Sequence, residues 1–132
     1  MNVIAIVLAA GKGTRMKSDL AKVLHPAAGR PLIAWVLESL EGVDVDQTVA
    51  VIGYQAEAVA ALLPDGVVAA IQYEQHGTGH ATEVGLAAAN VAPDDVVLVL
   101  LGDMPLITAA TLRSVLFVHE QTGAAATLLS VI

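Results

Sequence analysis

The sequence of 132 residues contains no cysteine, which excludes disulfide bonds and thiolate metal sites and leaves the cellular compartment open. Aromatic residues are also scarce, at 3 % of the chain, although 56 % of all residues are hydrophobic. The core must therefore be built from alanine, valine, leucine and isoleucine. This supply suits one domain in which alanine-rich helices cover a buried β-sheet.

Long hydrophobic runs are absent as well, because no apolar stretch approaches the ~18 residues that indicate a membrane-spanning helix. The first residues, Met1 to Ile4, include no basic segment, so no signal peptide is expected. We therefore expect a cytoplasmic protein without membrane insertion.

Positive charge is scarce too, and the net charge of −7 argues against a nucleic-acid-binding surface. The few basic residues are unevenly placed, since only Arg113 lies beyond residue 30. The other five are Lys12, Arg15, Lys17, Lys22 and Arg30. This cluster indicates either a solvated basic loop or a local site for a small polyanion.

Apolar runs alternate with helical patterns along the whole chain, which predicts an α/β fold with a largely parallel sheet and helices on both faces. The expected strands are 3–9, 47–52, 67–73, 96–101 and 124–132, and the expected helices are 31–40, 55–63, 77–90 and 109–121, the last capped by Thr108 and closed by Gly123. The chain stops inside the last apolar run. We therefore expect a C-terminally truncated domain whose natural polypeptide continues.

A glycine-rich segment, Leu8 to Met16, follows the first expected strand, where open α/β sheets bind their ligands. Glycines at positions 11 and 13 allow close approach of the backbone to phosphate oxygens, and nearby cations add charge. Met16 stands where a P-loop and a dinucleotide-binding fingerprint both require glycine. A tight turn without function stays open as the alternative.

Three motifs together resemble the sugar-nucleotide pyrophosphorylases. The family pattern is Leu-Ala-Ala-Gly-x-Gly-Thr-Arg-Met followed by Pro-Lys-Val-Leu, and this chain has Leu8 to Met16 followed by Ala21 to Leu24. The stretches Gln72 to Ala81 and Leu100 to Ile107 are similar to the family's uridine-reading loop and metal-binding strand end. The resemblance spans residues 3 to 107 and favours the bacterial N-acetylglucosamine-1-phosphate uridylyltransferases that are joined to an acetyltransferase.

The resemblance implies a Rossmann-like nucleotide-diphospho-sugar transferase fold, with residues 1–132 forming its N-terminal nucleotide-binding part. It implies catalytic roles for Arg15, toward the departing pyrophosphate, and for Lys22, toward the α-phosphate; Lys12 is a third candidate cation. Asp103 is expected to bind Mg²⁺, since that ion needs only one or two protein carboxylates when phosphates supply other ligands. The implied substrate contacts are Leu8, Ala9, Ala10, Gly11, Gly13, Thr14, Lys22, Gln72, Gly77, Thr78, Leu101, Gly102 and Asp103.

Several alternatives and departures stay open. Gln72 could instead bond a neighbouring loop, and His76 and His80, four apart, lack the acidic partner of a zinc motif. Ala21 stands where the family usually has proline, which is expected to loosen the loop that positions Lys22. Leu101 stands where tyrosine is frequent.

The implied reaction joins UTP and N-acetylglucosamine 1-phosphate into UDP-N-acetylglucosamine and pyrophosphate, without nucleic acid as a partner. A related cytidylyl- or guanylyltransferase and a non-catalytic nucleotide-binding module are the alternatives. The family implies a homo-oligomer, a trimer, for the full-length protein. We expect little or no activity from the 132 residues alone, because the expected sugar pocket and second metal ligand lie beyond them.

Overall fold

The computed structural model describes residues 2–13 and 17–130. Its main sheet has four parallel strands in the order β5-β4-β1-β6, and a small antiparallel pair, β2 and β3, stands apart. The strands are β1 (Val3–Ala9), β2 (Pro26–Ala27), β3 (Arg30–Pro31), β4 (Gln47–Ile52), β5 (Val68–Ile71) and β6 (Val96–Leu101). The helices are the 3₁₀ helix η2 (Lys22–Leu24) and the α-helices α1 (Leu32–Glu41), α2 (Ala56–Ala60), α3 (Gly77–Ala88) and α4 (Ala109–Thr122).

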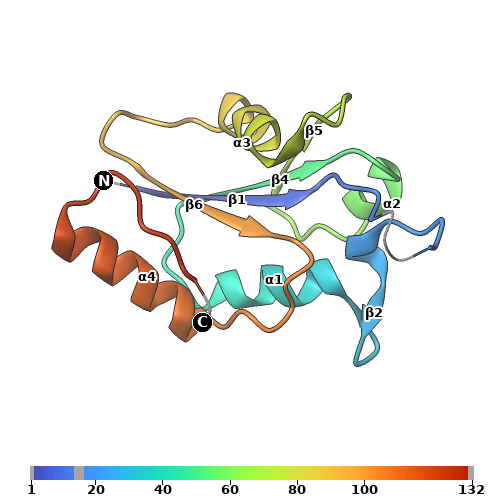
Figure 1. Ribbon diagram of the computed structural model, residues 1–132, viewed down its shortest axis with the longest axis horizontal. Helices are drawn as coiled ribbons and strands as arrows, with labels where there is room; N and C mark the ends of the chain where they lie inside the picture. The colour runs from blue at the N-terminus through green and yellow to red at the C-terminus, as the bar shows by residue number, and fades with distance from the viewer. Residues whose placement is uncertain (1, 14–16, 131–132) are drawn as a thin grey trace.

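Helices cover both faces of the sheet, with α3 on one side and α1 and α4 on the other (Figure 1). The central strand β1 is apolar on both faces because successive side chains point in opposite directions. Ile4 and Ile6 pack in the cluster beneath α3, whereas Ala5, Val7 and Ala9 belong to the cluster beneath α1. The predicted fold class, a parallel sheet between two helical layers, is confirmed.

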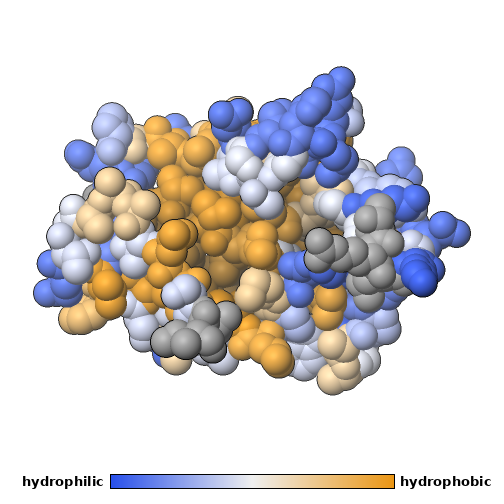
Figure 2. Space-filling model, in the orientation of Figure 1, coloured by the Kyte–Doolittle hydropathy of each residue, from blue (hydrophilic) through white to orange (hydrophobic). Residues whose placement is uncertain are grey.

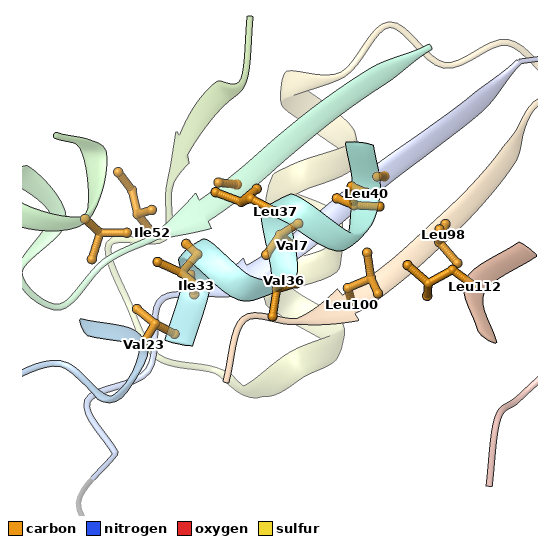
Figure 3. Packing of buried hydrophobic residues seen from close by; sticks show 14 of the residues in the cluster. Val7, Val23, Ile33, Val36, Leu37, Leu40, Ile52, Leu98, Leu100 and Leu112 are labelled. Carbon is orange, nitrogen blue, oxygen red and sulfur yellow. The ribbon is translucent and has the colours of Figure 1, made fainter. Parts of the chain in front are cut away.

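The larger core cluster lies between the sheet and α1. Ile33, Val36, Leu37 and Leu40 recur at helical spacing on one face of α1 and are buried. Figure 3 shows them converging with Val7, Ile52, Leu98 and Leu100 of the strands and with Leu112 of α4. This packing fixes the position of the strands relative to α1, and so it also fixes where the loops at their carboxyl ends begin.

On the opposite face, α3 approaches the sheet closely because its contact residues are small. A Cβ atom added at Gly85 would lie 2.6 Å from Ile6 Cγ2 and 3.0 Å from Val51 Cγ2. Ile6 and Val51 are fully buried and branched at Cβ, so neither has space to move aside. Gly85 therefore sets the distance between α3 and the sheet.

Gly85→Ala is expected to destabilise the protein by about 1–3 kcal/mol, the usual effect of overpacking a core. Gly79 lies in the same helix with nothing within 4 Å of an added Cβ. Gly79→Ala should therefore stabilise the helix by up to about 1 kcal/mol. Urea unfolding followed by circular dichroism would compare the two variants, and equal effects would contradict close packing at Gly85.

Two carboxylates secure the amino end of β1 between its neighbours. The Val3 amide donates to Asp46 Oδ2 at 2.8 Å, and the Asn2 amide donates to Asp95 Oδ1 at 2.9 Å. Backbone hydrogen bonds from the amides of Ala92 and Asn2 hold the pKa of Asp95 below its usual value. These bonds anchor β1 at the edge opposite the glycine-rich loop.

Three expected elements are shorter than the sequence pattern predicts, and the last expected strand is not formed by the described residues. The helix expected over 55–63 spans Ala56–Ala60, the strand over 67–73 spans Val68–Ile71, and the helix over 77–90 spans Gly77–Ala88. The strand expected over 124–132 is wrong for residues 124–130, which form no strand; 131 and 132 lie outside the described residues. An apolar run becomes a strand only by pairing, and here Thr127 Oγ1 is instead 3.0 Å from His119 Nδ1 of α4.

An apolar surface accompanies this segment along the outer edge of β6, as the large hydrophobic area in Figure 2 shows. Val99 and Leu101 of β6 are exposed, and so are Leu128 and Leu129. Contiguous apolar surface of this kind is typical of interaction sites and ligand-binding grooves. Within residues 2–13 and 17–130, no helix combines the length and the apolar character needed to cross a bilayer.

Candidate active site

The carboxyl ends of the parallel strands, at the right of Figure 1, surround a cavity of about 350 Å³. Many of the predicted contact residues line this cavity together, namely Leu8, Ala9, Ala10, Gly11, Gly13, Lys22, Gln72, Gly77, Thr78, Leu101 and Asp103. Val23, Gln75 and Ala81 line it as well. A larger hollow of about 670 Å³ lies along the apolar edge of β6 and contains none of the predicted cations. We therefore place the candidate site at the strand ends.

Three predicted positions need separate mention. Thr14 and Arg15, with the neighbouring Met16, lie outside the described residues. Gly102 is buried behind the cavity and does not line it. A Cβ atom at Gly102 would lie 2.9 Å from the Leu8 carbonyl oxygen, whose hydrogen bond from the Gly102 amide measures 2.8 Å. Glycine there allows the end of β6 to approach β1, and this approach brings the adjacent Asp103 to the cavity.

The glycine-rich loop and the 3₁₀ helix η2 approach each other at Gly13. Its φ of +72° is a conformation that favours glycine, and an added Cβ would lie 2.5 Å from Lys22 Cβ. The loop therefore folds directly over the start of η2, and the two segments bring the backbone of the first to the side chain of Lys22.

The ammonium group of Lys22 lies 2.7 Å from Asp103 Oδ2. The Lys22 side chain is 42 % exposed and that of Asp103 is 26 % exposed, so solvent and ligands can reach both groups. An ion pair of this exposure contributes little to stability. Its geometry has chemical value instead, because a donor for phosphate oxygens and a carboxylate that can bind a cation meet at one point.

Gln72 is the buried polar residue of the cavity, with 3 % of its surface exposed. Its Nε2 is 2.9 Å from His80 Nδ1 and donates to the Gly77 carbonyl oxygen at 3.4 Å. Because Gly77 O can only accept, the amide group is oriented with Nε2 toward α3. Within the described part of the chain Oε1 accepts no hydrogen bond, so this oxygen can receive a donor from a ligand.

The two histidines of this region do not form a metal centre with acidic partners. His76 pairs with Glu74 at 2.7 Å at the surface, and His80 contacts Gln72. Across residues 2–13 and 17–130, no three His, Cys, Asp or Glu side chains are close enough to hold a metal ion together. A metal at this site would therefore need ligands from a substrate in addition to Asp103.

The sequence pattern missed a role for Gln75. Its Nε2 donates to the Ala10 carbonyl oxygen at 3.1 Å and lies 2.9 Å from the position of a Cβ atom at Gly53. Gln75 thus links the segment after β5 to the glycine-rich loop. Its place three residues after Gln72, within the same motif, was the available signal.

Ala21, which stands where the family usually has proline, has a contact that the sequence pattern did not indicate. Ala21 is fully buried, and its amide donates to Gln55 Oε1 at 2.6 Å. The sequence alone could not identify this bond, because Gln55 is 34 residues away in the chain.

The fold is an α/β domain with a cavity at the carboxyl ends of its strands, where open α/β sheets bind their ligands. A family model, the MobA-like NTP transferase domain, matches residues 5–131. The chain therefore belongs to this family, which confirms the resemblance to nucleotidyltransferases drawn from the three motifs.

Individual relatives agree with that assignment. "Bifunctional protein GlmU" of Pelobacter propionicus is 51 % identical over 132 residues, a match that covers 98 % of this chain and 28 % of the relative. The crystal structure of Rv0371c from Mycobacterium tuberculosis superposes with a TM-score of 0.76 at 28 % identity, over 91 % of this chain and 61 % of that one. A manganese complex of the same mycobacterial protein has a TM-score of 0.73 at 28 % identity, over 91 % and 60 % of the two chains.

Proposed function

We propose that this chain is the nucleotide-binding part of an enzyme that transfers a uridylyl group from UTP to N-acetylglucosamine 1-phosphate. The observation that carries the proposal is the meeting of Lys22 and Asp103, 2.7 Å apart, beside a glycine-rich loop at the strand ends. The 51 % identity to a GlmU protein supports this substrate pair. The chain spans 28 % of that relative's length, so the reaction of the whole protein is part of the proposal.

The nucleoside would lie along the backbone of Leu8 to Gly11, where small side chains permit close approach of a ribose and a base. Gln72 Oε1 would accept the N3–H of uracil, since this edge of the base offers a donor between two acceptors. Gly77 and Thr78 begin α3 and line the same cavity, so their backbone would contact the other polar atoms of the base.

The proposed reaction needs charge stabilisation more than covalent participation. A phosphate oxygen of the sugar phosphate forms a bond to the α-phosphorus, while the bond to the β-phosphate bridging oxygen breaks and pyrophosphate leaves. Negative charge then spreads over the oxygens of the α-phosphorus, where fixed cations stabilise it. Lys22 would donate to the α-phosphate, and Arg15 would hold the pyrophosphate.

A divalent metal fits the donor set at Asp103. One carboxylate beside a phosphate-binding cation is what Mg²⁺ requires when phosphate oxygens and water supply its other ligands. We therefore propose Mg²⁺, held by Asp103 and UTP; the manganese complex of the mycobacterial relative supports a divalent ion. Such an ion neutralises developing phosphate charge when bound. Lys22 would then exchange its pairing with Asp103 for pairing with the phosphate.

Two other functions compete with this proposal. A cytidylyl- or guanylyltransferase would use the same loop with a different base, and the similarity to a GlmU protein speaks against it. A non-catalytic module that only binds nucleotide would have no need of Asp103 next to Lys22.

We further propose that the full-length protein is a cytoplasmic homotrimer, as the resemblance implies.

Calorimetric titration of the 132-residue chain with UTP, CTP and GTP, each with and without Mg²⁺, tests the proposal. Selective UTP binding that Mg²⁺ strengthens is expected. Preference for CTP or GTP would favour the related transferases, and UTP binding indifferent to Mg²⁺ would favour the binding module. A chain that is folded by circular dichroism and binds none of the nucleotides would contradict the proposal.

A further inference from the structure

The turn after β4, Gly53 to Gln55, lies against the glycine-rich loop. The Tyr54 amide donates to the Ala10 carbonyl oxygen at 3.1 Å, and the Tyr54 hydroxyl donates to the Asp19 carbonyl oxygen at 2.5 Å. The Lys12 ammonium group lies 5.2 Å from the centre of the Tyr54 ring, within the range of a cation–π contact. Tyr54 thus contacts both the glycine-rich loop, at Ala10, and the segment before η2, at Asp19.

The next residue of the turn contacts the backbone immediately before Lys22. Gln55 Oε1 accepts a hydrogen bond of 2.6 Å from the Ala21 amide. The orientation of the Gln55 side chain follows from chemistry, because a backbone N–H can only donate and the carbonyl oxygen must face it. Ala21 is fully buried, whereas Gln55 is exposed, so an exposed side chain folds down onto a buried amide.

The backbone of Gln55 has an unfavourable conformation, which also indicates that its side chain has a specific role. Its φ of 54° and ψ of 42° lie in the left-handed region, where glycine fits better than glutamine. A residue held in such a conformation is a reason to look for a function of its side chain. Within the described residues, this side chain makes its hydrogen bond to the Ala21 amide.

Ala21 itself has φ of −53° and ψ of 138°, which a proline ring could adopt. Proline would restrict this backbone covalently and would remove the N–H that Gln55 binds. With alanine at this position, the hydrogen bond to Gln55 Oε1 holds the same backbone conformation. Lys22 follows directly, and its ammonium group reaches Asp103 across the cavity.

We propose that Gln55 is a positioning residue, whose hydrogen bond to the Ala21 amide fixes the backbone that presents Lys22 to the nucleotide phosphates. The proposal rests on the proposed function, since it assigns Lys22 to a phosphate. Gln55 is not among the residues that line the cavity, so it would act through Ala21.

A double-mutant cycle on the 132-residue chain tests this role, with the affinity for UTP in the presence of Mg²⁺ as the readout. Gln55→Ala is expected to weaken UTP binding by about 2- to 10-fold, the usual effect of one hydrogen bond. In the Ala21→Pro background the N–H is absent and the ring restricts φ. There, the same Gln55→Ala change is expected to alter UTP affinity by less than about 1.5-fold, because Gln55 has no partner to lose.

Gln55→Gly separates the side chain from the backbone. Glycine relieves the left-handed conformation, so this variant should unfold in urea at the same or a higher concentration than the parent chain. It should nevertheless bind UTP as weakly as Gln55→Ala. If the role of Gln55 were merely structural, a Gln55→Gly variant that is as stable as the parent chain would also bind UTP as tightly as the parent chain.

Amide hydrogen exchange at Ala21, measured by NMR without nucleotide, gives a second readout. Exchange should be about 2- to 10-fold faster in Gln55→Ala than in the parent chain. Equal exchange in the two chains would overturn the proposal, as would a Gln55→Ala effect on UTP binding that is absent or is equally large in the Ala21→Pro background. If the parent chain binds no UTP, the proposed function fails, and the Ala21 exchange rate still decides whether Gln55 holds this backbone.

Discussion

Replacing Lys22 with alanine is expected to weaken binding of UTP with Mg²⁺ to the 132-residue chain by about 10- to 100-fold. The physical reason is the loss of a charge-assisted hydrogen bond to the α-phosphate, worth about 1.5–3 kcal/mol. In a longer polypeptide that catalyses the proposed uridylyl transfer, the same change should lower kcat by ~10²-fold or more, as the loss of a preorganised hydrogen-bond donor does. Calorimetry measures the first effect, and release of pyrophosphate measures the second.

Lys17→Gln is the control, because it removes the same charge from the segment just before η2, which begins at Lys22. Lys17 is exposed and does not line the cavity, so screening by salt should limit its effect on UTP affinity to about twofold. Equal losses in the two variants would mean that the loop attracts UTP by its total charge. Near-normal UTP binding and turnover in Lys22→Ala would refute the assignment of Lys22.

Replacing Asp103 with asparagine is expected to abolish the strengthening of UTP binding by Mg²⁺. Asparagine has nearly the same shape, but a neutral amide is a poor ligand for this hard cation. The change also removes the carboxylate that lies 2.7 Å from the Lys22 ammonium group. Without Mg²⁺, the variant should therefore bind UTP at least as tightly as the parent chain, because Lys22 is released and a negative charge is gone.

Asp19→Asn is the control for this variant. Asp19 lies in the segment just before η2, and its described contact with Tyr54 uses its backbone oxygen, so Mg²⁺ should strengthen UTP binding as in the parent chain. The ratio of the dissociation constants without and with Mg²⁺ is the quantity to compare. An unchanged ratio in Asp103→Asn would show that the metal is bound elsewhere or travels only with UTP.

Together these two variants describe a linkage between metal and nucleotide. In this structure Lys22 and Asp103 neutralise each other. A cation at Asp103 would weaken that pairing and leave Lys22 available to a phosphate, so each ligand should raise the affinity for the other. The expected sign is therefore positive for Mg²⁺ and UTP, and it depends on both residues.

Local patterns were sufficient for much of the fold. The strands Val3–Ala9, Gln47–Ile52 and Val96–Leu101 were predicted with their observed bounds, because each is a largely apolar run that ends at or shortly before a glycine. Thr108 and Gly123 close α4 as expected, since the Thr108 hydroxyl accepts from the Thr111 amide and Gly123 has φ of 61°.

The same kind of pattern failed at residues 124–130. Their apolar composition is that of a strand, but a strand exists only where another strand supplies hydrogen bonds. The described residues show a contact to His119 instead of a ladder with β6. Composition is a local property and pairing is not, so the run alone could not decide the outcome.

The candidate site divides in the same way. The sequence by itself determined which chemical groups are present: a glycine-rich loop, the cation Lys22, the carboxylate Asp103 and the amide Gln72, each at the end of an apolar strand or in a motif of fixed spacing. Only the tertiary structure decided the order of the strands, the ion pair between Lys22 and Asp103, and the hydrogen bond from the Ala21 amide to Gln55. The reason is that these contacts depend on how parallel strands align in the sheet, and that alignment comes from packing against α1 and α3 rather than from any neighbouring residue.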